Sequence, residues 1–205
     1  MIELNFLRYF FIIIIVLFLI GMFAPMVLIK KKGIDPHGTH EGASLLTRLT
    51  SITIFSWLIY NILYIISPLT VLRFLVFEWL VSDIFILIGI VIIFLGLILD
   101  LWGTIALGIN FRIELPKEDT TLITTGIYRL MRNPIVMGVY LLIFGSFLII
   151  PTIISLLFLI ANIITFDSKV KDEEKFLAKR FGEKFERYSK KVGRYLPFSI
   201  RKNKI

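Results

Sequence analysis

The stretch of sequence that decides the fold is residues 82–107, SDIFILIGIVIIFLGLILDLWGTIAL. A helix needs about 20 predominantly apolar residues to cross the hydrocarbon core of a bilayer. This stretch is longer and contains only two charged residues, Asp83 and Asp100, so it predicts a membrane-spanning helix. A carboxylate within a span usually faces protein or water. We expect Asp100 to have such a role, to lie at the interface, or to pair with Arg112.

Four further apolar runs flank this segment and predict four more spans. They are residues 6–29, 45–66, 135–150 and 152–166. Pro151 separates the last two runs, which are short, and this arrangement favours a tight hairpin. Residues 69–81 contain Arg73, Glu78 and Trp79 and are typical of a short segment at the membrane interface.

Residues 167–192 differ in kind from the spans. Apolar side chains recur there at helical spacing, with basic residues between them: Phe176, Leu177, Phe181, Phe185 and Tyr188. This pattern predicts an amphipathic helix on the membrane surface, or two helices divided at Gly182.

Composition agrees with a membrane protein. Of the 205 residues, 57% are hydrophobic, the mean hydropathy is +0.87, and soluble domains average only about 45–50% apolar residues. We therefore predict an all-α polytopic membrane protein of about five transmembrane helices, with residues 1–205 forming one integral membrane domain. The chain has no cysteine, which excludes disulfides and thiolate chemistry. His37 and His40, beside Glu41, form only a weak metal-binding pattern, and we expect a solvated loop and no metal site.

Basic residues are unevenly distributed along the chain. The net charge is +8, and residues 169–204 alone carry thirteen of the 23 lysines and arginines. With five spans and the N-terminus outside, 21 of the 23 fall on the inner side, leaving only Arg8 and Arg73 outside. The positive-inside rule therefore predicts an external N-terminus and a cytoplasmic C-terminus. Nucleic-acid binding is disfavoured because acidic residues alternate with the basic ones and a span precedes them.

Residues 124–138 combine features of a helix start with two arginines. Asn133 suits the N-cap and Pro134 the first helical position. One interpretation is simply a capped span with flanking charges. The other is a ligand site, since a helix N-terminus offers free N–H groups and Gly138 would let a ligand approach the backbone closely.

A second candidate element follows the last span. Glu173 and Glu174 are adjacent acids that could merely favour a helix N-terminus. Alternatively, one carboxylate binds a cation at the mouth of the hairpin, for which a sulfonium or an α-amino group would be suitable.

Together, these two segments resemble the isoprenylcysteine carboxyl methyltransferase and phospholipid methyltransferase superfamily. The resemblance covers residues 96–198, whereas residues 1–95 are not diagnostic. The matching positions in the first segment are Gly126, Tyr128, Arg129, Arg132, Pro134 and Gly138. Those in the second are Glu173, Glu174, Leu177, Phe181, Gly182, Tyr188, Arg194 and Pro197. Leu107-Gly108 and Asn110-Phe111-Arg112 also look like a stretch of the family pattern.

Three residues depart from the family pattern. Asn133 replaces the signature histidine, Val136 the signature tyrosine, and Lys169 an arginine. The family histidine and tyrosine lie near the cofactor, and the arginine acts on the prenylcysteine carboxylate. These departures put the prenylcysteine substrate in doubt more than the fold. Lys169 keeps the positive charge of the arginine but lacks its bidentate fork.

The resemblance implies methyl transfer from S-adenosylmethionine to a lipophilic acceptor, a carboxylate or lipid head group, at the cytoplasmic face. It implies that Lys169 and Arg132 position the acceptor. It also implies cofactor binding by Tyr128, Asn133, Pro134, Gly138, Glu173 and Glu174. A lipophilic or lipidated substrate and membrane lipids are then the expected partners, without nucleic acid.

Two other functions remain open at this point. One is an NADPH-dependent membrane reductase of the sterol-reductase type, which shares a related C-terminal pattern. The other is a non-catalytic lipid-binding membrane protein with an eroded site, which the three departures would favour.

Overall fold

A computed structural model describes residues 2–33, 45–71, 75–108 and 121–197. Its long helices are α1 (Leu4–Lys31), α2 (Leu45–Ile66), α4 (Asp83–Leu107), α5 (Pro134–Ile149) and α6 (Ile153–Phe181). The short elements are α3 (Pro68–Val71), η1 (Glu78–Leu80), η3 (Gly126–Arg129) and α7 (Glu183–Lys191). The described residues form no strand, only two isolated β-bridges. The predicted all-α class is therefore confirmed.

Four of these helices, α1, α2, α4 and α6, are long and apolar enough to cross a membrane, and α5 is a shorter apolar helix. Large apolar side chains are exposed along them, including Ile13, Ile62, Ile88 and Ile164. In water such surfaces would be unfavourable, whereas in a bilayer they face hydrocarbon. The chain is accordingly an integral membrane protein.

The predicted spans agree closely with the observed helices. α2 has the predicted bounds, and α1 and α5 begin or end within two residues of theirs. α4 begins one residue later than predicted because Ser82 is its N-cap, with the side chain accepting a hydrogen bond of 3.5 Å from the Phe85 N–H. The described part of the segment predicted to lie at the interface contains only α3 and η1, two short turns, and therefore no span.

The prediction of a separate helix beginning at residue 167 was wrong. α6 continues without interruption from Ile153 to Phe181, so the last span and the charged segment are one helix. No glycine or proline lies between these residues to break the helix at the change from apolar to charged sequence. The predicted division at Gly182 is confirmed: its φ of +51° ends α6, and α7 begins at the next residue.

α4 and α5 pack with their backbones in close contact. Glycines recur every seven residues, at Gly89 and Gly96 on α4 and at Gly138 and Gly145 on α5. A Cβ atom at Gly96 would lie 2.7 Å from the Gly138 carbonyl oxygen, and one at Gly145 would lie 2.6 Å from the Gly89 carbonyl oxygen. Small residues at membrane helix interfaces allow such approach, so α4 and α5 form a tightly joined antiparallel pair.

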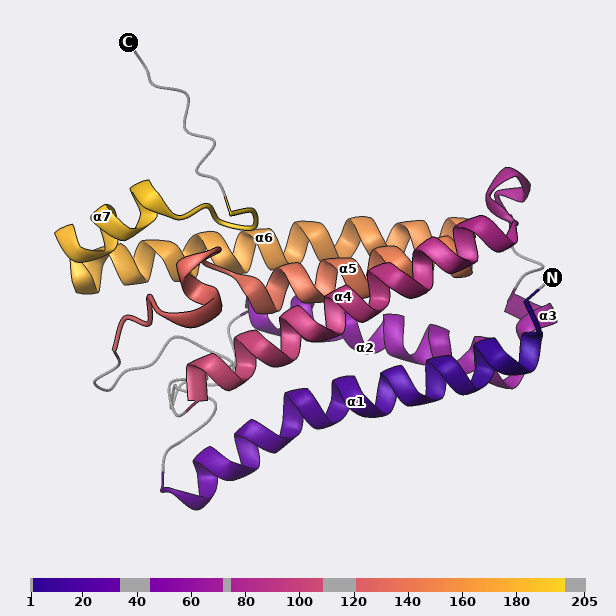
Figure 1. The fold of residues 1–205 in the computed structure, drawn as a ribbon, viewed down its shortest axis with the longest axis horizontal. Coiled ribbons are helices and arrows are strands. Elements are labelled where there is room, and N and C mark those ends of the chain that lie inside the picture. Colours follow the sequence, from indigo (N-terminus) through magenta and orange to yellow (C-terminus); the bar gives the residue numbers. More distant parts are fainter. Residues whose placement is uncertain (1, 34–44, 72–74, 109–120, 198–205) are drawn as a thin grey trace, which may run out of the picture.

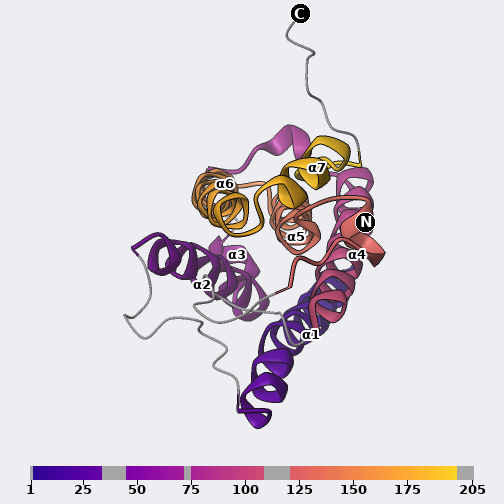
Figure 2. The same ribbon diagram turned by 90° about the vertical axis from the view of Figure 1, so that its left-hand side faces the viewer.

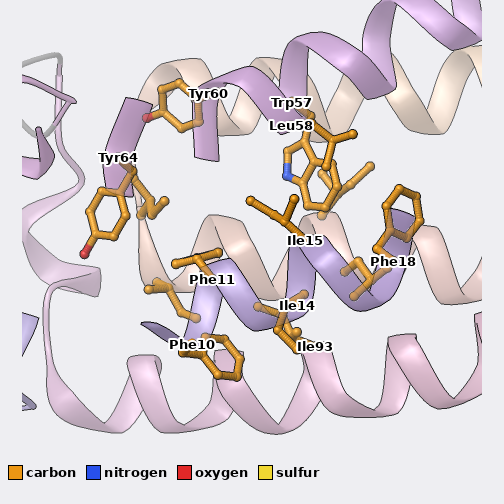
Figure 3. Packing of buried hydrophobic residues seen from close by; sticks show 14 of the residues in the cluster. Phe10, Phe11, Ile14, Ile15, Phe18, Trp57, Leu58, Tyr60, Tyr64 and Ile93 are labelled. Carbon is orange, nitrogen blue, oxygen red and sulfur yellow. The ribbon is translucent and has the colours of Figure 1, made fainter. Parts of the chain in front are cut away.

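α1 and α2 pack through aromatic and branched side chains, with α4 beside them (Figure 3). The ring centroids of Phe18 and Trp57 are 6.1 Å apart, and those of Phe11 and Tyr64 are 5.6 Å apart. Edge-to-face pairs at these distances are favourable beyond their buried area. This cluster fixes the N-terminal helices against the α4–α5 pair.

The five long helices alternate in direction (Figure 1). α1, α4 and α6 end, and α2 and α5 begin, at the same end of the molecule, where α7 folds back beside α5 and α6 (Figures 1 and 2). We call this the α7 end. The N-terminus lies at the opposite end. Because α1 and α6 both end at the α7 end, the lysines at the end of α1 and the basic residues of α6 and α7 gather there.

Candidate functional site

At the α7 end, the segment after α7 lies beside the start of α5. The Arg132 N–H donates to the Gly193 carbonyl at 2.9 Å, and the Asn133 N–H donates to the Arg194 carbonyl at 3.0 Å. Met131 and Gly193 form an isolated parallel bridge. These backbone contacts join two segments that are about 60 residues apart in the chain.

An ion-pair clasp, formed by Arg132, Glu174 and Arg194, reinforces this junction. The Arg132 Nη2 lies 2.7 Å from Glu174 Oε1, and the Arg194 Nη2 lies 2.6 Å from Glu174 Oε2. Both guanidinium groups also donate through Nε, at 3.0 and 3.2 Å respectively. Because the Glu174 side chain is only 15% exposed, these charge-assisted bonds are partly shielded from water and correspondingly strong.

Arg132 and Glu174 therefore have most of their hydrogen-bonding capacity occupied within the protein. Arg132 Nη1 also donates to the carbonyl groups of Ser189 (3.0 Å) and Val192. Sequence analysis proposed Arg132 for the acceptor and Glu174 for the cofactor. In the structure, these two side chains instead join α5, α6 and the segment after α7.

Arg194 is the residue of the clasp that sequence analysis left out of the site. It was recognised as a motif position only, because no spacing rule connects it to Glu174. The hydrogen bond to Glu174 raises the pKa of Arg194 above its ordinary value, so its charge is fixed. A further contact links the same segment to α6: the Tyr195 hydroxyl donates to Asp167 Oδ1 at 2.9 Å.

Tyr128 is buried where η3 meets the end of α4. Its hydroxyl donates to the Gly103 carbonyl at 3.3 Å, and its own carbonyl accepts a bond of 2.6 Å from the Tyr188 hydroxyl. Burial raises the pKa of Tyr188 to about 12 and raises that of Tyr128 as well. Both phenols are therefore neutral hydrogen-bond donors at physiological pH and are poor candidates for a general base.

Asn133 and Pro134 occupy the predicted first positions of α5, N-cap and N1. The Asn133 side chain does not cap the helix, however, and its amide group donates to the Arg194 carbonyl at 3.4 Å. The N–H groups of Arg132 and Asn133 are likewise occupied, and proline has none. Within the described residues, the free N–H groups of this helix start are those of Ile135 and Val136.

The close approach permitted by Gly138 is made by α4. A Cβ atom at this position would lie 2.6 Å from the Gly96 carbonyl oxygen and 2.9 Å from Asp100 Cβ. The prediction that a ligand approaches Gly138 is therefore corrected: the adjacent helix fills that space.

Asp100 lies in the same interface and is 5% exposed. Its carboxylate is 3.4 Å from the position of a Cβ atom at Gly21, so glycines of α1 and α5 make room for it. Asp100 therefore faces protein, as expected for a carboxylate within a span. The proposed partner Arg112, like His37, His40 and Glu41, lies outside the described residues.

Lys169 and Glu173 lie on a different side of α6 from Glu174, the residue through which α6 takes part in the clasp. They are four residues apart and therefore share one face of the helix, whereas Glu173 and Glu174 point about 100° apart. Glu173 as a whole residue is exposed, but its carboxyl group is surrounded by protein atoms, and this burial raises its pKa, although the nearby Lys169 charge acts in the opposite direction. Of the adjacent acids, Glu173 is thus the one that lies outside the ion-pair clasp.

Comparison with known families matches residues 84–184 to the phospholipid methyltransferase family. This range includes α4 from its second residue, the whole segment between α4 and α5, and all of α5 and α6. It contains Arg132 and Glu174, whereas Arg194 lies beyond it.

Curated relatives are similar to somewhat more than half of the chain. A probable protein-S-isoprenylcysteine O-methyltransferase from Oryza sativa subsp. indica is 32% identical over 124 residues, which cover 58% of this chain and 63% of the relative. A protein-S-isoprenylcysteine O-methyltransferase from Xenopus laevis is 30% identical over 115 residues, covering 54% of this chain and 40% of the relative. The chain thus spans about 40–63% of the length of these relatives.

Proposed function

Because residues 84–184 relate this chain to the phospholipid and isoprenylcysteine methyltransferases, we propose that it transfers a methyl group from S-adenosylmethionine to a lipophilic acceptor. The observation that carries the proposal is the bond between Arg132 and Glu174, which are 42 residues apart. It brings the two motif segments of the superfamily to one place, at the end of the molecule that carries most of the charge. A capped span and an isolated acidic pair would not require this contact.

The residues around this junction are chemically suited to the cofactor. The sulfonium and amino groups of the cofactor are cations, and Glu173, which lies outside the clasp, supplies a carboxylate. The carboxylate of the cofactor is an anion, and the Val136 N–H lies at the positive end of the α5 dipole, whereas the Ile135 nitrogen packs against Gly103 of α4. When bound, the cofactor supplies an electrophilic methyl group. The protein then has to align donor and acceptor, which can lower a barrier by about 7–11 kcal/mol.

The side chains present favour an acceptor that needs no deprotonation. Tyr128 and Tyr188 remain protonated because their pKa values are raised. Glu174 is held by two arginines and is a weak base. A carboxylate is already ionised at neutral pH, so it is the acceptor that this site suits best, and Lys169 can hold its charge.

A lipophilic acceptor follows from the surroundings of the site. The helices that reach it, α4, α5 and α6, present mostly apolar side chains along their membrane portions. Burial of acceptor hydrocarbon stabilises binding by about 25 cal/mol per Å². The acceptor's long chain would therefore supply most of the binding energy, while Lys169 holds its polar end.

The distribution of charge supports a cytoplasmic site. The three lysines at the end of α1 and the basic residues of α6 and α7 share the α7 end, and cytoplasmic loops are enriched in such residues. Reporter fusions after Lys32 and after Arg194 should both read cytoplasmic, and one at Ser67 should read external. A cytoplasmic signal at Ser67 would contradict this orientation.

The central test is a binding titration of the purified full chain with S-adenosylmethionine and, separately, with NADPH. Saturable binding of S-adenosylmethionine alone is expected. Binding of NADPH alone would favour a reductase, and binding of neither would favour a non-catalytic membrane protein.

Labelled methyl transfer to membrane and to soluble extracts then tests the acceptor. Label in lipid-soluble products is expected, and label only in small water-soluble products would contradict a lipophilic acceptor.

A further inference from the structure

A groove of about 290 Å³ opens between α1 and the last turns of α4. It is lined by Pro25, Leu28, Ile29, Lys32, Thr104, Ile105 and Gly108. Lys32 is the only charged residue in this lining, and Thr104 is buried. The volume lies near the lower limit of about 300 Å³ for small-molecule sites, so the groove suits one hydrocarbon chain better than a bulky ring system.

The groove has a closed inner end and an open outer end. At Gly21, one helical turn before Pro25, a Cβ atom would lie 2.6 Å from Leu101, so α1 and α4 are in close contact there. At Gly108, no described residue lies within 4 Å of the Cβ position. A chain could therefore enter from the outer end and stop where the two helices meet.

Three adjacent lysines, Lys30, Lys31 and Lys32, stand at the open end and are exposed. None of them forms an ion pair with another described residue. Lysines at a helix C-terminus favour the helix dipole, but this role does not account for an apolar groove that continues directly from Lys32. Cationic groups above an apolar channel complement a molecule with an anionic head and a hydrocarbon tail.

We propose that this groove binds an anionic phospholipid of the bilayer, with one acyl chain between α1 and α4 and the phosphate group against Lys30, Lys31 and Lys32. The groove shares no residue with the ion-pair clasp or with the Lys169 and Glu173 face. The lipid site is thus distinct from the methyl-transfer site and does not depend on that activity.

Native mass spectrometry of the purified full chain in detergent tests the proposal without any methyl donor present. Phosphatidylglycerol and phosphatidylcholine with identical acyl chains are titrated in parallel. We expect phosphatidylglycerol to bind more tightly, and each lysine removed to lower its affinity by about fivefold. The variants are K32Q and the triple K30Q/K31Q/K32Q, with K190Q/K191Q on α7 as the charge control.

A second variant keeps all three lysines, because these residues also orient α1 in the membrane. Leu28→Trp should fill the groove and lower phosphatidylglycerol binding, whereas Leu87→Trp, on the exposed surface of α4, should not. Equal affinity for the two lipids, or an equal loss in K190Q/K191Q and in the triple variant, would overturn the proposal.

Discussion

Two sides of α6 differ in role, although the residues that define them are adjacent in sequence. Glu174 is held by Arg132 and Arg194 and is largely shielded from solvent. Glu173 is exposed and shares its face with Lys169. The difference shows that one acidic motif can serve two purposes, because a step of one residue rotates a helical side chain by about 100°. One carboxylate joins three segments of the tertiary structure, and the other lies outside this clasp.

The largest effect is expected at the ion-pair clasp. Glu174→Ala leaves two guanidinium groups without their carboxylate, and breaking a buried ion pair on one side costs up to about 3–5 kcal/mol. Because the Arg194 side chain is 32% exposed, we expect about 2–3 kcal/mol. Unfolding of the purified protein in detergent measures this change. Glu183→Ala, which removes an exposed pair with Arg187, should cost under about 1 kcal/mol.

A comparable effect is expected from Gly138→Ala, at a motif glycine that also builds the fold. Its Cβ would meet backbone atoms of α4 at 2.6–2.7 Å, and overpacking of this kind typically costs about 1–3 kcal/mol. Leu95→Ala on the exposed surface of α4 is the control. Unchanged unfolding of the glycine variant, with a selective loss of cofactor affinity, would restore Gly138 as a ligand contact.

On the other side of α6, Lys169 should affect turnover rather than stability. We expect Lys169→Ala to lower turnover at least about tenfold, or about 1.4 kcal/mol, with cofactor affinity nearly unchanged. Lys169→Arg should preserve activity because the charge remains. Steady-state kinetics of methyl transfer distinguish these outcomes, and a large loss of cofactor binding in Lys169→Ala would contradict a role in holding the acceptor.

Glu173→Gln sharpens the comparison most directly. It should weaken S-adenosylmethionine binding by about tenfold, or roughly 1.4 kcal/mol, without changing the unfolding midpoint. Glu186→Gln, an exposed acid on α7, should change neither quantity. If Glu173→Gln unfolds as readily as Glu174→Ala, the two sides of the helix do not have separate roles.

The smallest effect is expected for Tyr188→Phe, which removes one hydrogen bond to the Tyr128 carbonyl and should cost about 1 kcal/mol. The raised pKa of Tyr188, about 12, adds a pH dependence. Below about pH 10, where the unfolded phenol is also protonated, its contribution is complete. It decreases as the pH rises through 12. Tyr9→Phe, on the exposed surface of α1, should leave the alkaline stability unchanged.

Sequence periodicity and length determined the helices well because span length is set by the bilayer and apolar runs are local features. The bounds of α2 and the break at Gly182 were predicted for this reason. The continuity of α6 was missed because a change in composition at Asp167 was taken as a change of element. Charge alone does not end a helix without a residue that disrupts its backbone.

The sequence by itself determined the membrane character, the order of the five long helices, and the two segments that resemble a methyltransferase. Only the tertiary structure decided which motif residues build the protein and which remain free to bind. Arg132 and Arg194 meet Glu174 through contacts between residues 42 and 20 positions apart, and Gly138 is covered by a helix that precedes it by some 30 residues. Such pairings depend on how helices pack, and no local pattern encodes them.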